Sequence, residues 1–78
     1  MTLLTYQVFQ TIADVGSFQK AADLLGLTPS AVSHTISSME NELGFSVFNR
    51  SKAGISLTNY GEKLLPYING VLNSDESL

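Results

Sequence analysis

Four side chains with hydrogen-bonding chemistry lie close together in the middle of the sequence. They are Ser30, Ser33, His34 and Ser37. A serine with a nearby histidine can act as a nucleophile, because the imidazole accepts the hydroxyl proton. The same hydroxyl and imidazole groups also donate and accept hydrogen bonds when a polar ligand lies against them. The element that carries these groups therefore decides between the two kinds of chemistry.

Length and composition argue against catalysis and against a metal site. A chain of 78 residues forms one small domain with little core to spare for a deep pocket. His34 is the single histidine and cysteine is absent, so neither a zinc site nor a disulfide is expected. We expect no enzyme activity, no metal and no other cofactor. No stretch resembles a membrane span or a targeting signal, so we expect a cytoplasmic protein with no membrane partner.

The four side chains lie on a predicted helix over residues 29–43. Thr28 suits the N-cap, Pro29 suits the first helical position, where no backbone N–H is needed, and Gly44 suits the end. At about 100° per residue, the apolar residues fall on one side of this helix and the four polar groups on the other. The apolar residues are Val32, Ile36, Met39 and Leu43. The polar groups are therefore predicted to face outward, while the apolar side packs on a core.

Apolar residues at helical spacing predict three more helices, over residues 3–15, 18–25 and 59–73. Pro66 lies inside the last of these, so this helix should either start at the proline or bend around it. The fold class predicted from these elements is mostly α.

The spacing changes to alternation after Gly44, which predicts a short β-hairpin over residues 46–57 with Gly54 in the turn. We therefore divide the chain into a domain over residues 1–58, a helix over 59–73 and a tail over 74–78.

The two helices that flank Gly26-Leu27-Thr28 form a helix-turn-helix over about residues 18–37, and the hairpin makes it the winged kind. An α-helix fits the major groove of DNA, where short polar side chains meet base edges or phosphates. We therefore predict that this protein binds double-stranded DNA through the start and the outer face of the second helix. The predicted contacts there are Thr28, Pro29, Ser30, Ser33, His34 and Ser37.

The charge distribution favours DNA binding locally but not for the chain as a whole. The net charge is −3, so there is no general attraction to nucleic acid. Residues 46–65, however, contain three cations and one acid. We expect Arg50 and Lys52 to lie at the hairpin tip and to contact phosphates or the flanking minor groove. The competing interpretation makes Arg50 a structural partner of Glu40 or Glu42.

The predicted helix over residues 59–73 has two adjacent apolar stripes, a wider face than packing on one domain requires. We expect this face to pair two copies of the chain into a homodimer, although the two tyrosines could instead pack on the domain itself. The predicted dimerisation residues are Tyr60, Leu64, Leu65, Tyr67, Ile68, Val71 and Leu72. The alternative is a protein-interaction module that dimerises with, or sequesters, a longer regulator.

Several short motifs occur in register over about residues 3–72. They are Gly16-Ser17-Phe18 with Ala21-Ala22-x-Leu24, Thr28-Pro29-Ser30-Ala31-Val32-Ser33 with Ile36, Met39-Glu40-x-x-Leu43-Gly44, Val47-Phe48-x-Arg50 and Leu57-Thr58-x-x-Gly61. With these motifs the chain resembles the N-terminal DNA-binding domain of LysR-type transcriptional regulators. The resemblance implies a sequence-specific regulator of transcription, a recognition helix beginning at Pro29 and a long fourth helix that pairs two subunits.

Members of this family are usually longer and sense a small molecule through a C-terminal domain, so we expect such an effector only where that domain is present. The sequence also departs from the family at Thr35, Ser37 and Ser38, where relatives often have arginine, lysine or glutamine. Direct recognition of guanine by a long cationic side chain of this helix is therefore not expected.

Overall fold

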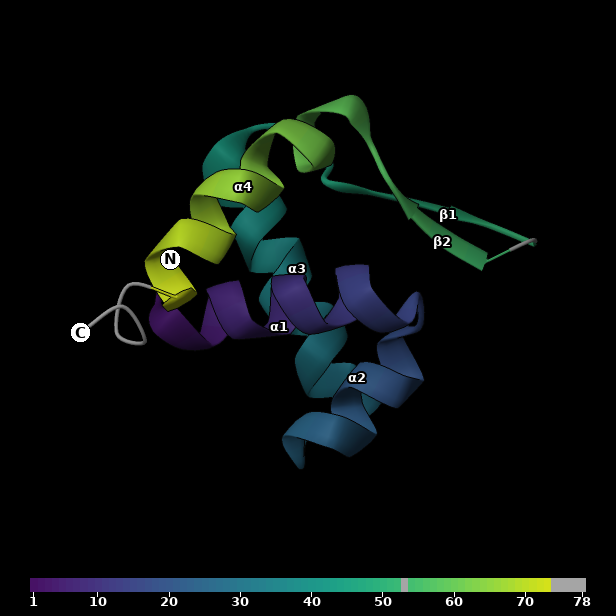
Figure 1. Ribbon diagram of the computed structural model, residues 1–78. Helices are drawn as coiled ribbons and strands as arrows, with labels where there is room; N and C mark the ends of the chain where they lie inside the picture. The colour runs from purple at the N-terminus through teal and green to yellow at the C-terminus, as the bar shows by residue number, and fades with distance from the viewer. Residues whose placement is uncertain (53, 74–78) are drawn as a thin grey trace.

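The computed structural model describes residues 1–52 and 54–73 of the chain. Within these residues the chain forms four helices and one two-stranded antiparallel sheet (Figure 1). The elements are α1 (Leu3–Val15), α2 (Phe18–Leu25), α3 (Pro29–Leu43), β1 (Phe48–Ser51), β2 (Gly54–Leu57) and α4 (Asn59–Asn73). The predicted fold class, mostly α with a small β-hairpin, is confirmed. The predicted tail over residues 74–78 lies outside the described residues.

The capping residues of α3 explain why both ends of this helix can be predicted from the sequence. The Thr28 hydroxyl accepts a hydrogen bond from the Ala31 N–H at 3.1 Å, and Pro29 occupies the first turn. At the other end Gly44 has a φ of 83°, which a residue with a side chain rarely adopts. The helix therefore begins and ends where its capping residues predict.

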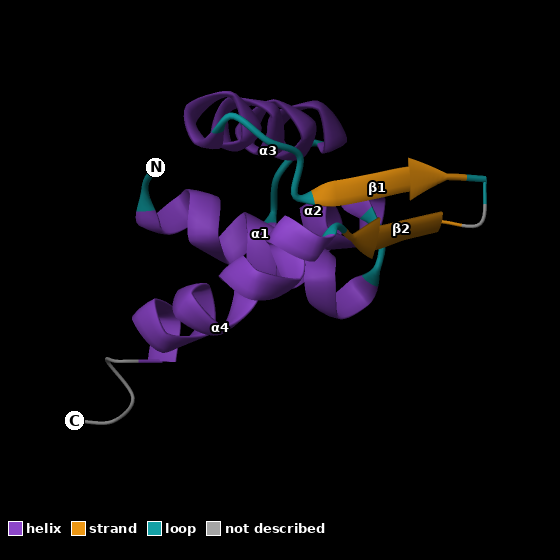
Figure 2. Ribbon diagram, turned by 90° about the horizontal axis from the view of Figure 1, so that it is seen from above, coloured by secondary structure: helices purple, strands orange, loops and turns teal. Residues whose placement is uncertain are grey.

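The core lies where α1 crosses between α3 and α4, as the view from above shows (Figure 2). Helix α2 packs against α1 and α3, and the sheet projects to one side as a wing. The buried apolar side chains are Val8, Phe9, Ile12, Ala21, Ala22, Val32, Ile36, Met39, Val47, Phe48 and Ile68. Burial of one side of α3 in this core leaves its opposite side facing solvent.

The base of the wing is tied to the start of α4. The Thr58 hydroxyl accepts a hydrogen bond from the Gly61 N–H at 3.1 Å and donates one to the Ser46 carbonyl at 2.7 Å. The Thr58 N–H also donates to the Val47 carbonyl at 3.0 Å. Helix α4 then continues through Pro66, so the expectation that it starts at the proline is wrong.

Candidate nucleic-acid interface

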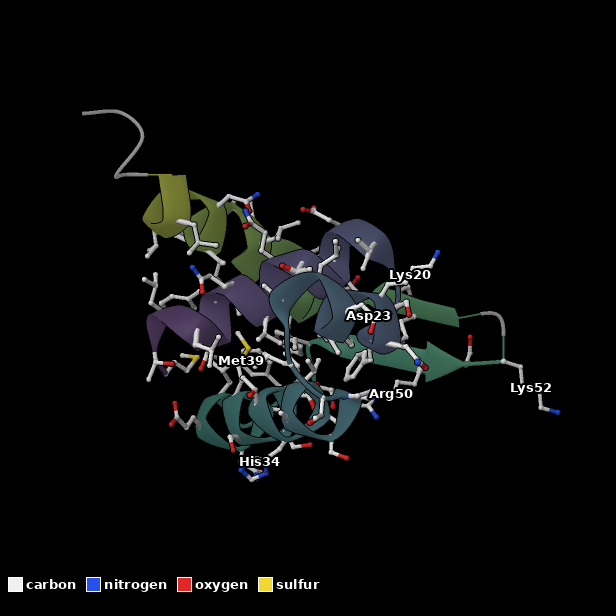
Figure 3. All side chains as sticks on the ribbon, turned by 90° about the horizontal axis from the view of Figure 1, so that it is seen from below. Lys20, Asp23, His34, Met39, Arg50 and Lys52 are labelled. Atoms are coloured by element: carbon white, nitrogen blue, oxygen red, sulfur yellow. The ribbon has the colours of Figure 1, made fainter. Side chains whose placement is uncertain are left out.

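The outer face of α3 presents the polar side chains that the sequence predicted. Ser30, His34 and Ser37 are exposed and Ser33 is half-buried, whereas Ile36 on the opposite side is fully buried. His34 points away from the rest of the protein on this face (Figure 3). The structure therefore brings the four predicted side chains to one accessible surface.

None of these four side chains makes a hydrogen bond to another part of the chain within residues 1–52 and 54–73. Thr35, on the same helix, is different, because its hydroxyl donates to the Ala31 carbonyl at 2.9 Å. The outer face of α3 thus keeps its hydroxyl and imidazole groups free for a ligand.

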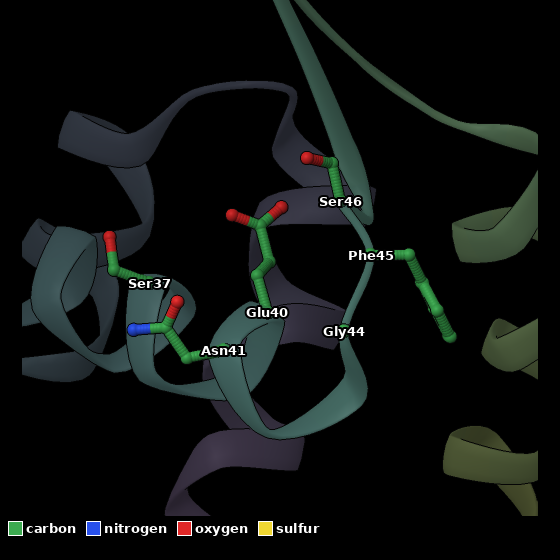
Figure 4. A pocket seen from close by; sticks show the side chains of 6 residues that line it. All are labelled: Ser37, Glu40, Asn41, Gly44, Phe45 and Ser46. Atoms are coloured by element: carbon green, nitrogen blue, oxygen red, sulfur yellow. The ribbon is translucent and has the colours of Figure 1, made fainter.

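Two hollows lie near the end of α3, and the first includes Ser37 of its outer face. The first, of about 410 Å³, is lined by Ser37, Glu40, Asn41, Gly44, Phe45 and Ser46 (Figure 4). The second, of about 420 Å³, lies between Phe45 and the base of the wing. Over the described residues, no group of three or more His, Asp or Glu side chains is placed to hold a metal ion.

The two wing cations lie in different surroundings. Lys52 is exposed at the far end of the wing, as predicted (Figure 3). Arg50 does not lie at the tip, because it belongs to β1 and pairs with Ile55. Its guanidinium carbon lies 4.3 Å from the centroid of the Phe18 ring, at the start of α2. The wing therefore presents one cation at its end and one beside the helix-turn-helix.

The alternative pairing of Arg50 with Glu40 or Glu42 is wrong, because both carboxylates have other partners. Glu40 Oε2 accepts the Val47 N–H at 2.8 Å and lies 3.5 Å from the Phe48 N–H. Glu42 Oε2 lies 2.8 Å from the Met1 ammonium group, the single ion pair in the described part of the chain. The Arg50 charge therefore has no carboxylate partner there.

The predicted dimerisation residues of α4 differ in how accessible their side chains are. Tyr67 and Val71 are 76% and 49% exposed, so they are accessible to a partner. Ile68 is 2% exposed and belongs to the core, so its side chain serves the domain and not a partner, which corrects the prediction for this residue. Tyr60 is exposed but also stacks on Phe45, with ring centroids 4.5 Å apart. The remaining three, Leu64, Leu65 and Leu72, are partly buried against the core.

Helix α1 adds apolar surface that sequence analysis missed. Leu3 and Leu4 are 55% and 45% exposed, on a helix that packs beside α4. Leu4 is at helical spacing with Val8 and Ile12, a pattern that favours an inward-facing side chain. In the structure the buried side of α1 is instead centred on Val8, Phe9 and Ile12. Leu3 is not at helical spacing with Val8 and Ile12, so the sequence could have indicated that its side chain faces outward.

Comparison with known proteins places the chain among bacterial regulators. The family described as "Bacterial regulatory helix-turn-helix protein, lysR family" matches residues 3–62. The transcriptional regulator CzcR of Bacillus anthracis is 41% identical over 78 residues, covering 100% of this chain and 27% of the relative. The regulator HdfR of Salmonella newport is 43% identical over 68 residues, covering 87% of this chain and 24% of the relative. The chain thus spans about a quarter of the length of these curated relatives.

Solved structures with the same fold include a complex with DNA. The DNA-binding domain of BenM, in complex with catB site 1 DNA, superposes with a TM-score of 0.93 at 27% identity, covering 99% of this chain and 86% of that one. The C206S mutant of the OxyR protein of Corynebacterium glutamicum, with hydrogen peroxide bound, gives a TM-score of 0.92 at 34% identity, covering 97% of this chain and 24% of that one. The similarity extends over all four helices and the wing.

Proposed function

Because the chain belongs to the LysR family of bacterial helix-turn-helix regulatory proteins, we propose that it binds specific double-stranded DNA sites as a homodimer and thereby regulates transcription. The described residues form a LysR-type winged helix-turn-helix DNA-binding domain, and this domain family is not an enzyme family. The observation that carries the proposal is the accessible, unpaired polar face of α3. A DNA complex of the structurally similar BenM domain supports it.

In the proposed complex α3 enters the major groove. Burial of Val32, Ile36 and Met39 fixes the helix on the core, so its outer face keeps a fixed position relative to the rest of the domain. Ser30, Ser33, His34 and Ser37 then reach base edges or phosphates, and the capped start of the helix at Thr28 and Pro29 approaches the backbone. Because all these side chains are short, the helix must come close to the bases.

The wing supplies most of the electrostatic contact in this proposal. Arg50 and Lys52 are exposed cations with no carboxylate partner in the described part of the chain, so binding DNA phosphates breaks no ion pair. If Arg50 and Lys52 of both protomers of a dimer engage phosphates, four phosphates are neutralised, and the slope of log affinity against log salt is about −4, at about −0.9 per phosphate. A slope near zero on the selected site would contradict this arrangement.

We further propose that α4, residues 59–73, pairs two protomers through Tyr67 and Val71 together with Leu3 and Leu4 of α1. These side chains expose apolar area that a second copy would cover. A two-fold symmetric dimer presents two copies of α3, so its DNA site should be an inverted repeat. Residues 1–58 would then read DNA, while α4 sets the separation of the two half-sites.

The proposed site of action is the bacterial cytoplasm, where the DNA lies. No helix in the described part of the chain is long and apolar enough to cross a membrane. Whole regulators of this kind are about four times longer than this chain, and control by a small molecule is proposed only for a protein that carries an additional effector domain.

The decisive experiment is selection of bound duplexes from a random DNA pool at fixed salt, followed by gel retardation with the selected site. Recovery of an inverted repeat supports the proposal, and loss of retardation on joint replacement of Arg50 and Lys52 by alanine supports the role of the wing. The control variant is Lys63→Ala, which removes an exposed cation from α4. A pool without enrichment, with dimerisation intact, would favour the alternative of an interaction module that pairs with a longer regulator.

A further inference from the structure

A row of aromatic rings connects the protein core to the Arg50 side chain. Phe9 and Phe48 are in contact, with ring centroids 5.2 Å apart. Phe48 meets Phe18 edge to face, with a centroid distance of 5.9 Å and an interplanar angle of 73°. The Arg50 guanidinium carbon lies 4.3 Å from the centroid of Phe18. The cation therefore rests on a ring that is itself packed against the core.

The positions of the two partners are fixed by the secondary structure. Successive side chains of a strand point to opposite faces, so Phe48 and Arg50 of β1 share one face and both lie toward α2. Phe18 is the first residue of α2, and this turn is fixed by the Ser17 hydroxyl, which accepts a hydrogen bond from the Lys20 N–H at 3.1 Å. Phe18 is half-buried and Phe48 is 6% exposed, so neither ring is free to move away.

We infer that Phe18 is a positioning residue for DNA binding, because it holds the Arg50 guanidinium beside the helix-turn-helix before DNA arrives. This inference rests on the proposed function. An unrestrained arginine on an exposed strand samples many rotamers, and binding must select one of them at an entropic cost. A guanidinium stacked on an aromatic ring keeps its N–H groups free along its edge, where a phosphate can accept two hydrogen bonds.

The contact between Arg50 and Phe18 joins the wing to α2. Because α2 packs against α3, the contact also restricts the position of the wing relative to α3. The expected effect of losing it equals that of an exposed cation–π contact, about two- to fivefold in affinity for each protomer. A dimer bound to two half-sites should lose about four- to twenty-fivefold in affinity, because the contact is lost twice.

The test is a double-mutant cycle with the duplex that the wild-type chain selects from a random pool. Phe18→Met keeps the apolar bulk but removes the aromatic ring, and Arg50→Gln removes the cation. We expect Phe18→Met to weaken binding by the stated factor in the wild-type background and to have almost no effect in the Arg50→Gln background. Phe18→Tyr, which keeps the ring, should restore wild-type affinity.

A matched control is Phe45→Met, because Phe45 stacks on Tyr60 and contacts no cation among the described residues. This variant should retain wild-type affinity. Melting temperatures of all variants identify any change caused by loss of folded protein. Equal effects of Phe18→Met in both backgrounds would show that Phe18 acts only through the fold, and would overturn the inference while leaving the proposed function intact.

A second measurement needs neither variants nor DNA. The δ-methylene protons of Arg50 lie near the Phe18 ring, so their NMR signals in the free wild-type chain should be shifted upfield by the ring current. Normal chemical shifts for these protons would overturn the inference. If the wild-type chain selects no DNA sequence, the proposed function is refuted. The role of Phe18 in DNA binding is then refuted as well, even if the ring-current shift shows that the contact with Arg50 exists.

Discussion

Replacing Gly61 by alanine should destabilise the protein, although alanine is the better helix former. Gly61 lies in the first turn of α4, directly against the base of the wing. A Cβ atom at this position would collide with the Val47 carbonyl oxygen and would lie 2.9 Å from the Leu57 Cδ2 atom. The Val47 carbonyl cannot easily move away, because it accepts the Thr58 N–H at 3.0 Å. Either the wing or the start of α4 must therefore shift.

The magnitude follows from two opposing contributions. Alanine gains about 1 kcal/mol over glycine in a helix. Inserting a methyl group into a fully packed contact costs about 1–3 kcal/mol, and the upper end applies here because the obstacle is backbone. The net loss should be about 1–2 kcal/mol in the free energy of unfolding. For a domain of this size that lowers the melting temperature by about 5–15 °C.

The assay is thermal and urea unfolding of Gly61→Ala beside the wild-type chain. Gly70→Ala is the matched control, because Gly70 lies in the same helix and a Cβ there has no atom within 4 Å. This control should be unchanged or stabilised by up to about 1 kcal/mol. All samples need the same protein concentration, since dimerisation would make the melting temperature concentration-dependent. If Gly61→Ala is as stable as Gly70→Ala, the close approach of α4 to the wing is refuted.

Two further predictions test the wing and the proposed dimer. Glu40→Ala should lower the free energy of unfolding by about 1.5–3 kcal/mol, because the Val47 N–H loses a charged acceptor, and urea denaturation measures this loss. Replacing Tyr67 and Val71 together by glutamate should convert the dimer to monomer, because like charges would face each other across the two-fold axis. Sedimentation velocity checks this, and an unchanged dimer would place the interface elsewhere.

Local sequence signals determined the helices and the face of α3. Thr28, Pro29 and Gly44 act on their immediate neighbours, through a side-chain cap, a missing N–H and a left-handed conformation, so their effects can be read without knowing the fold. The helical spacing of Val32, Ile36 and Met39 likewise fixes which side of α3 is buried. The outward position of His34 follows from the same geometry.

Only the tertiary structure decided where Arg50 rests, which apolar residues of α4 remain accessible and how α1 is turned. Arg50 meets Phe18 because the wing folds back toward α2, a contact between segments 32 residues apart in sequence. Ile68 is buried while Tyr67 beside it is exposed, since α1 covers one side of α4 and not the other. Periodicity shows that a helix has an apolar face, but the packing angle between helices selects which part of that face is covered. That angle depends on all the side chains at the contact together, so no single stretch of sequence contains it.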